Sequence, residues 1–128
     1  MFFINDYEKK RGERMTSSLL QALKENILIA DGAIGTLLYA HGVDQCFEAY
    51  NLSKPEEVLQ VHQSYIDAGA DIIQTNTYGA NYIKLARFGL EEKVHQINTR
   101  AVQLAKQAAK KMKHLYLGRL VEFEEFKS

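Results

Sequence analysis

Two apolar segments of the chain each run into a polar loop that contains glycine, and this repeated pattern restricts the folds open to it. The first segment, 27–30, is followed by an aspartate and two glycines within 31–36. The second, 70–74, is followed by the loop Thr75-Asn76-Thr77-Tyr78-Gly79. The apolar runs predict a buried strand over about 27–31 and a second strand over about 71–75. Because parallel α/β proteins bind ligands at the carboxyl ends of their strands, both loops are expected at the same rim.

A helix between the two strands is predicted from its start and stop signals. Ser53 and Glu56 have the spacing of a capping box, and Pro55 falls in the first turn, where its missing N–H costs little. The helix is expected to run to about Ala68, and Gly69 suits the position just after its end.

Further helices are predicted from capping residues, glycines and helical spacing. They are expected over about 16–23, 37–40 (ending at Gly42), 80–88 and 91–111, with a longer connection over 43–52. The last helix carries one apolar stripe, formed by Val94, Ile97, Ala101, Leu104, Ala105 and Ala108. Alternation of strands and helices predicts an α/β fold with a parallel sheet, and residues 114–118 can begin a third strand.

Composition excludes several classes of protein. The 128 residues carry no net formal charge, which argues against nucleic-acid binding through a basic surface. No apolar run approaches the roughly 20 residues of a membrane helix, and residues 1–14 lack the hydrophobic region of a signal peptide. Neither a nucleic acid nor a membrane is therefore expected as a partner. The single cysteine, Cys46, excludes an internal disulfide and fits the reducing cytoplasm, which is the expected location.

Three blocks of the sequence resemble the homocysteine S-methyltransferase domain. They are Asp31–Thr36 (DGAIGT), Asn51–Pro55 (NLSKP) and Tyr65–Asn81 (YIDAGADIIQTNTYGAN), in the order found in that family. The similarity covers about 19–110 and extends to members in which a methylenetetrahydrofolate reductase domain is joined to this domain. The resemblance implies a (β/α)8 TIM barrel that binds homocysteine and a zinc ion at its C-terminal rim. It also implies a reductase domain as a partner in the intact gene product.

The resemblance implies a reaction as well, a zinc-dependent methyl transfer. Zinc binds the sulfur of homocysteine and favours the thiolate, which is the nucleophilic form. The thiolate attacks a methyl group carried by folate, betaine or S-methylmethionine, depending on the family member, and methionine is the product.

Motif matches assign a substrate pocket residue by residue. Asp31 matches an acidic residue beside the amino-acid end of homocysteine, where a carboxylate suits an α-ammonium group. Gly32 and Ala33 match a loop whose backbone lies close to the substrate, where a bulky side chain would block approach. The other expected substrate contacts lie at the rim of the second strand: Asn76, Thr77 and Tyr78. From the residues alone, other roles stay open: Asp31 as a loop or capping carboxylate, and Asn76 and Thr77 as caps of the next helix.

The zinc ligands of the family are not matched in this sequence. They are three cysteines, one in a later strand and an adjacent pair near the C-terminus of the domain, and Cys46 corresponds to none of them. No catalytic and no metal-binding residue is therefore assigned. The histidines lack metal-ligand spacing, and His62 and His95 are expected on helix surfaces.

The resemblance implies that the chain holds an N-terminal fragment of the barrel, about its first two βα units. Residues 15–110 are expected to form this N-terminal part, with Met15 as the natural start. Residues 1–14 are expected to be a non-native extension or disordered, and residues 111–128 a divergent tail. Two alternatives to an active methyltransferase remain: a catalytically inactive truncated fragment, and a small α/β module that binds another amino acid or phosphate at the Asp31 rim.

Overall fold

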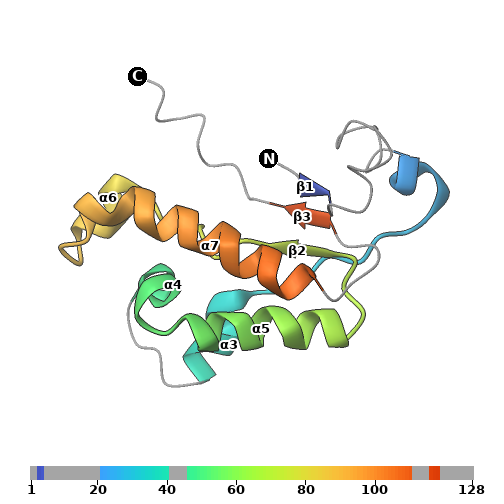
Figure 1. Cartoon of the computed structure of the whole chain (residues 1–128), viewed down its shortest axis with the longest axis horizontal. Coiled ribbons are helices and arrows are strands. Elements are labelled where there is room, and N and C mark those ends of the chain that lie inside the picture. Colours follow the sequence, from blue (N-terminus) through green and yellow to red (C-terminus); the bar gives the residue numbers. More distant parts are fainter. Residues whose placement is uncertain (1–2, 5–20, 41–45, 111–115, 119–128) are drawn as a thin grey trace.

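The computed structural model describes residues 3–4, 21–40, 46–110 and 116–118. Within them, α-helices pack against a short open sheet, as Figure 1 shows. Residues 21–25 are helical. The remaining elements, in chain order, are β1 (Phe3–Ile4), α3 (Ile34–Ala40), η1 (Phe47–Ala49), α4 (Tyr50–Ser53), α5 (Pro55–Asp67), β2 (Ile72–Gln74), α6 (Tyr82–Ala86), η2 (Glu91–Lys93), α7 (Val94–Ala109) and β3 (Tyr116–Gly118).

The sheet has the strand order β1-β3-β2. Strands β2 and β3 are parallel, with Ile73 opposite Leu117, and β1 pairs with β3 in the antiparallel direction. On the other side of β2, Ala30 forms an isolated parallel bridge with Ile72. The parallel relation of the first apolar segment, β2 and β3 is the predicted one, whereas the sequence did not predict β1. The described strands form an open sheet and close no barrel among themselves.

The first apolar segment differs from the predicted buried strand. It pairs with β2 through a single bridge, and the Ile27 and Ile29 side chains are 94% and 60% exposed. The backbone of Ile29 nevertheless accepts hydrogen bonds from Asp71 and Ile72. The segment therefore lies at an edge of the described sheet, bonded on one side, and none of the described helices buries these two isoleucines. The prediction of burial is wrong for both side chains.

Helix α5 begins later than its predicted cap. The chain is already helical in α4, where the Ser53 hydroxyl donates to the carbonyl of Ala49. The residue before α5 is Lys54, which makes no side-chain capping bond, so the predicted capping box is wrong. Pro55 does occupy the first position of α5, as predicted. At the other end Gly69 has φ +104°, the left-handed conformation expected just beyond a helix.

The predicted connection over 43–52 is also partly wrong, because residues 47–53 form η1 and α4. Neither element has enough residues to show a helical period. Helix α4 lies against both α5 and α7. Helix α4 therefore connects η1 to the two longest described helices, α5 and α7. Residues 41–45, including Gly42, lie outside the described part of the chain.

Helix α7 is the longest helix described. The sequence predicted one helix over 91–111, and the structure has η2 followed by α7. The predicted stripe faces inward, because five of its six residues are buried and Val94 packs against the core. Asn81 is the N-cap of helix α6, and its side chain accepts from the backbone N–H of Lys84. No described helix has the length and apolar character needed to cross a bilayer.

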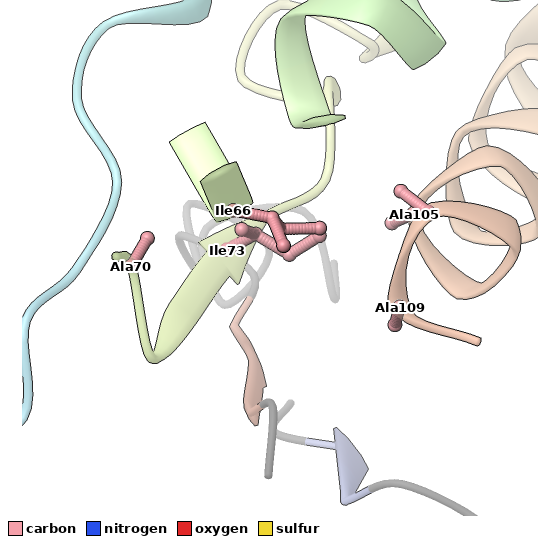
Figure 2. Close-up of a cluster of buried hydrophobic side chains, with 6 residues drawn as sticks. Ile66, Ala70, Ile73, Ala105 and Ala109 are labelled. Atoms are coloured by element: carbon pink, nitrogen blue, oxygen red, sulfur yellow. The ribbon is translucent and has the colours of Figure 1, made fainter. Parts of the chain in front are cut away.

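The core lies between α5, β2 and α7. Figure 2 shows one cluster, in which Ile66 of α5 and Ile73 of β2 meet the small side chains of Ala105 and Ala109 on α7. Small residues on α7 let the helix approach the sheet closely. A second cluster joins α3, α5 and α7, and consists of Leu38, Val58, Val61 and Leu104. The first cluster holds β2 against α5 and α7, and the second holds α3 against the same two helices.

Candidate functional site

The two strand tips predicted to share a rim do lie side by side. The backbone N–H of Asp31 donates to the carbonyl of Ile72 at 2.8 Å. The Oδ2 atom of Asp31 accepts from the backbone N–H of Gln74 at 3.0 Å. Asp31 is therefore tied to the last residue of β2 by its side chain as well as by its backbone.

A cavity of ≈ 330 Å³ opens at these tips. Five of the six predicted substrate contacts line it; Asp31 is the sixth and does not. The full lining is Gly32, Ala33, Ile34, Gly35, Phe47, Glu48, Gln74, Thr75, Asn76, Thr77 and Tyr78. Loops from three parts of the sequence thus meet around one volume of the size that suits a small ligand.

The carboxylate of Asp31 has two unlike oxygens. Oδ2 accepts the Gln74 bond, whereas Oδ1 is buried and has no hydrogen-bond partner among the described residues. Burial raises the pKa of Asp31 from 3.8 to about 6, and the bond from Gln74 opposes that rise. A buried acceptor without a donor costs free energy, so the Oδ1 position favours a bound donor.

The loop that contains Gly32 and Gly35 packs tightly against the side chains of Tyr65 and Phe47. A Cβ on Gly32 would lie 2.8 Å from the hydroxyl oxygen of Tyr65, and one on Gly35 would lie 3.1 Å from the Phe47 ring. The Tyr65 hydroxyl donates to the carbonyl of Ala33 at 3.3 Å. A side chain at Gly32 would therefore force Tyr65 to shift, and one at Gly35 would lie tightly against Phe47, a packing reason for glycine that sequence reasoning did not supply.

The rim of β2 is polar and mostly buried. Thr75, Asn76 and Thr77 are buried, and the two threonine hydroxyls lie 2.9 Å apart in a hydrogen bond. Tyr78 is 58% exposed, and the Lys84 ammonium lies 4.2 Å from the centre of its ring. The capping role left open for Asn76 and Thr77 does not apply, because Asn81 caps α6.

Phe47 and Glu48 are cavity residues that sequence reasoning missed. The Oε1 atom of Glu48 accepts from the backbone N–H of Gly79 at 2.6 Å, and a Cβ on Gly79 would lie 2.8 Å from that same oxygen. The carbonyl of Phe47 accepts from the Asn76 side chain. Residues 46–49 show neither a helical hydrophobic period nor a capping motif in the sequence. The one available signal was Gly79, a glycine at a position where another residue lies close to the backbone.

The described residues do not offer a metal site. No group of three His, Cys, Asp or Glu side chains among them has the arrangement of a metal centre. Cys46 is half-buried, and its thiol donates to Glu48 Oε2 at 3.8 Å. Burial raises the pKa of Cys46 and the Glu48 charge raises it further, so the thiol form is favoured over the metal-binding thiolate.

Two histidines have different surroundings. His95 is exposed on α7, as predicted. His62 on α5 is fully buried, so its predicted place on a helix surface is wrong, and neither ring nitrogen has a hydrogen-bond partner among the described residues. Burial lowers the pKa of His62 to about 4. His62 is therefore neutral near pH 7 and is not a cavity residue.

A mixed sheet packed against helices, with a cavity at the carboxyl ends of its parallel strands, is a common arrangement for binding small molecules. The family model for homocysteine S-methyltransferase matches residues 28–123. The chain belongs to the homocysteine S-methyltransferase family.

Relatives and solved structures agree with this membership. Methionine synthase of Mycobacterium leprae is 30% identical over 101 residues, which cover 73% of this chain and 8% of that protein. The homocysteine methyltransferase MmuM from Escherichia coli superimposes with a TM-score of 0.66 in its metallated form, at 25% identity over 77% of this chain and 39% of that chain. Its oxidized form gives a TM-score of 0.60 and 31% identity, over 72% and 34% of the two chains. The chain thus spans a minor part of each of these proteins.

Proposed function

We propose that the cavity at the two strand tips is the homocysteine site of a homocysteine S-methyltransferase domain. Membership of the family supports this, and so does the position of five expected contacts in the cavity lining. The observation on which the proposal depends most is the Asp31–Gln74 bond, which joins the two tips and leaves Asp31 Oδ1 without a partner among the described residues.

In this proposal the amino-acid end of the substrate is bound by charge and shape. Asp31 does not itself line the cavity but directly precedes the lining residue Gly32. In the proposal the ammonium group of homocysteine reaches the buried Asp31 Oδ1 from that edge of the cavity and gives it the charge-assisted hydrogen bond that it lacks. Gly32 and Ala33 let the ligand approach their backbone. The polar edge of the ligand meets Asn76 and Thr77, and Tyr78 covers the open side.

The reaction proposed for the intact domain is methyl transfer to the sulfur of homocysteine. A bond forms between sulfur and the methyl carbon, the bond from that carbon to the donor breaks, and the thiol proton is released. The donor class is a folate, a betaine or S-methylmethionine. Zinc, which the family resemblance implies, does not fit the described residues, so they supply binding and orientation. The poor fit of zinc to the described residues favours a second candidate function, that of a fragment that binds homocysteine without transferring the methyl group.

We extend the proposal to the architecture of the domain. Residues 15–110 form the N-terminal part of a (β/α)8 barrel, holding about two of its βα units, and residues 111–128 form a divergent tail. The parallel relation of the first segment to β2 supports this, because successive barrel strands are neighbours. A reductase domain as partner and a cytoplasmic location belong to the same proposal.

Isothermal titration calorimetry of the whole chain tests the site. With a reducing agent present, L-homocysteine should bind at one site per chain, and inorganic phosphate should give no heat. Phosphate binding that competes with homocysteine would favour the small α/β module instead. Absence of homocysteine binding at millimolar ligand would contradict the proposal. A separate assay for methionine, with zinc and S-methylmethionine added, distinguishes the active domain from the binding fragment.

A further inference from the structure

The side chain of Asn51 lies at the centre of a buried hydrogen-bond network behind the cavity. It is fully buried in α4 and does not line the cavity. Its Nδ2 donates to the carbonyl of Asn76 at 2.8 Å and to the carbonyl of Ile97 at 3.2 Å. Its Oδ1 accepts from the Asn76 side chain at 3.0 Å. Asn51 therefore connects α4, the rim of β2 and α7.

This network fixes the orientation of the Asn51 amide. Both N–H groups and the carbonyl oxygen are used, so a buried amide that would otherwise be costly is satisfied. A flipped amide would set Oδ1 against two carbonyl oxygens and lose every one of these bonds. One rotamer of Asn51 is thus strongly preferred.

Asn76 is held by the same network from two sides. Its backbone carbonyl accepts from Asn51, and its Nδ2 donates both to Asn51 and, at 2.8 Å, to the carbonyl of Phe47. Both amide protons of Asn76 are therefore used inside the protein. This leaves Oδ1 as the atom of that side chain that can accept a hydrogen bond from a ligand.

We propose that Asn51 is a positioning residue for the cavity: it holds Asn76, and through it the loop 75–78, in the conformation that receives the ligand. The identity of that ligand as homocysteine rests on the proposed function. Asn51 touches no ligand itself, since it lies behind the lining. Its role is to keep the rim preformed, so that binding does not have to order this loop.

The test compares Asn51→Ala with Ile66→Ala, a control in the core cluster of Figure 2, away from the cavity lining. Folded fractions are first measured by urea unfolding. Asn51→Ala should raise the dissociation constant for homocysteine about tenfold, the equivalent of roughly one hydrogen bond. Ile66→Ala should leave it unchanged once the folded fraction is taken into account. An equal effect of both variants would overturn the positioning role.

Hydrogen exchange gives a second readout that needs no ligand. In Asn51→Ala the backbone amides of Thr77 and Gly79 should lose at least about tenfold protection relative to that of Ile72, which is bonded at the opposite end of β2. An equal loss of protection at the amides of Ile72, Thr77 and Gly79 would contradict the proposal. If the wild-type chain fails to bind homocysteine, the proposed function fails, and the exchange data still decide the role of Asn51.

Should Asn51→Ala fail to fold, Asn51→Ser keeps a small polar side chain and serves in its place. The wild-type protein offers a further check through its side-chain amides. The Nδ2 protons of Asn51 should exchange much more slowly than those of exposed Asn26. Equal exchange at the two side chains would overturn the proposal.

Discussion

The carboxylate of Asp31 accepts a hydrogen bond from the backbone N–H of Gln74 at 3.0 Å, and this bond joins two strand ends that are more than forty residues apart in sequence. The bond occupies one carboxylate oxygen and leaves the other buried without a partner among the described residues. Asp31 therefore has a structural side and a side suited to a ligand. A substitution that keeps its shape can separate the two.

Asp31→Asn should weaken homocysteine binding without unfolding the chain. The amide oxygen can still accept from Gln74, but the charge that pairs with the ammonium group is lost. The dissociation constant should rise by about 10- to 100-fold, as expected for a charge-assisted hydrogen bond of roughly 1.5–3 kcal/mol. Calorimetry at pH 7 measures the affinity, and urea unfolding should give a free energy of unfolding no lower than that of the wild type.

Asp71→Asn is the matched control for Asp31→Asn. The Asp71 carboxylate also bonds the first apolar segment, since its Oδ2 accepts from the backbone N–H of Ile29 at 3.0 Å. Asp71 precedes β2, however, whereas Asp31 bonds the last residue of that strand, beside the cavity. Substitution of Asp71 should leave the homocysteine affinity unchanged. Equal losses in the two variants would mean that Asp31 acts only through the sheet.

Gly32→Ala should destabilise the fold by about 1–3 kcal/mol, the usual range for overpacking. The added methyl group would lie 2.8 Å from the Tyr65 hydroxyl oxygen, a separation that forces a shift. Adding Tyr65→Phe removes that oxygen and should restore part of the lost stability. Urea unfolding of the two single variants and the double variant forms a cycle, and purely additive effects would show that the contact is not the cause.

His62→Leu should make the protein more stable in acid relative to the wild type. The pKa of His62 is about 4 in the folded chain and about 6.5 when unfolded, so the unfolded state binds its proton first as pH falls. The titration of His62 therefore costs no stability above pH 6.5. As pH falls towards 4, the free energy of unfolding decreases by up to roughly 3 kcal/mol. Free energies of unfolding at pH 7 and 4.5 measure the difference between the variant and the wild type.

His95→Leu serves as the control for His62→Leu, because His95 is exposed on α7. Its substitution should leave the dependence of stability on pH as in the wild type. A similar change in both variants would show that burial of His62 is not responsible.

Ile27→Lys should change the free energy of unfolding by no more than about 0.5 kcal/mol, as for most surface substitutions. Its side chain is 94% exposed, whereas Ile73 is fully buried in β2. Ile73→Ala, the contrasting variant, should cost about 2–5 kcal/mol. A large loss in Ile27→Lys, measured in the same urea titrations, would mean that the first segment is covered after all.

Local sequence signals predicted the parts of the fold that depend on local geometry. Gly69 and Gly89 have positive φ close to the predicted ends of α5 and α6, because only glycine adopts that conformation at little cost. The stripe on α7 was correct because every fourth or third residue of a helix faces the same neighbour. The joining of the two strand tips likewise followed from the rule that parallel strands end at one rim.

Tertiary packing decided the rest, and no local pattern records it. Ser53 does not cap α5, because its hydroxyl donates to the carbonyl of Ala49. His62 is buried because other elements cover that face of α5, and Asn51 gains its role from partners 25 and 46 residues away. Ile27 and Ile29 show the reverse, apolar side chains that the described helices leave exposed.

Burial moves the titrations of Asp31 and His62 in opposite directions, and this has a consequence for the heat of unfolding. Near pH 5, folding takes up a proton at Asp31, because the pKa of this group rises from 3.8 to about 6. Folding at the same pH releases a proton from His62, because the pKa of the imidazole falls from 6.5 to about 4. The two exchanges with solvent cancel. Calorimetric enthalpies measured in acetate and in a buffer of very different ionisation heat should therefore agree more closely for the wild type than for either Asp31→Asn or His62→Leu.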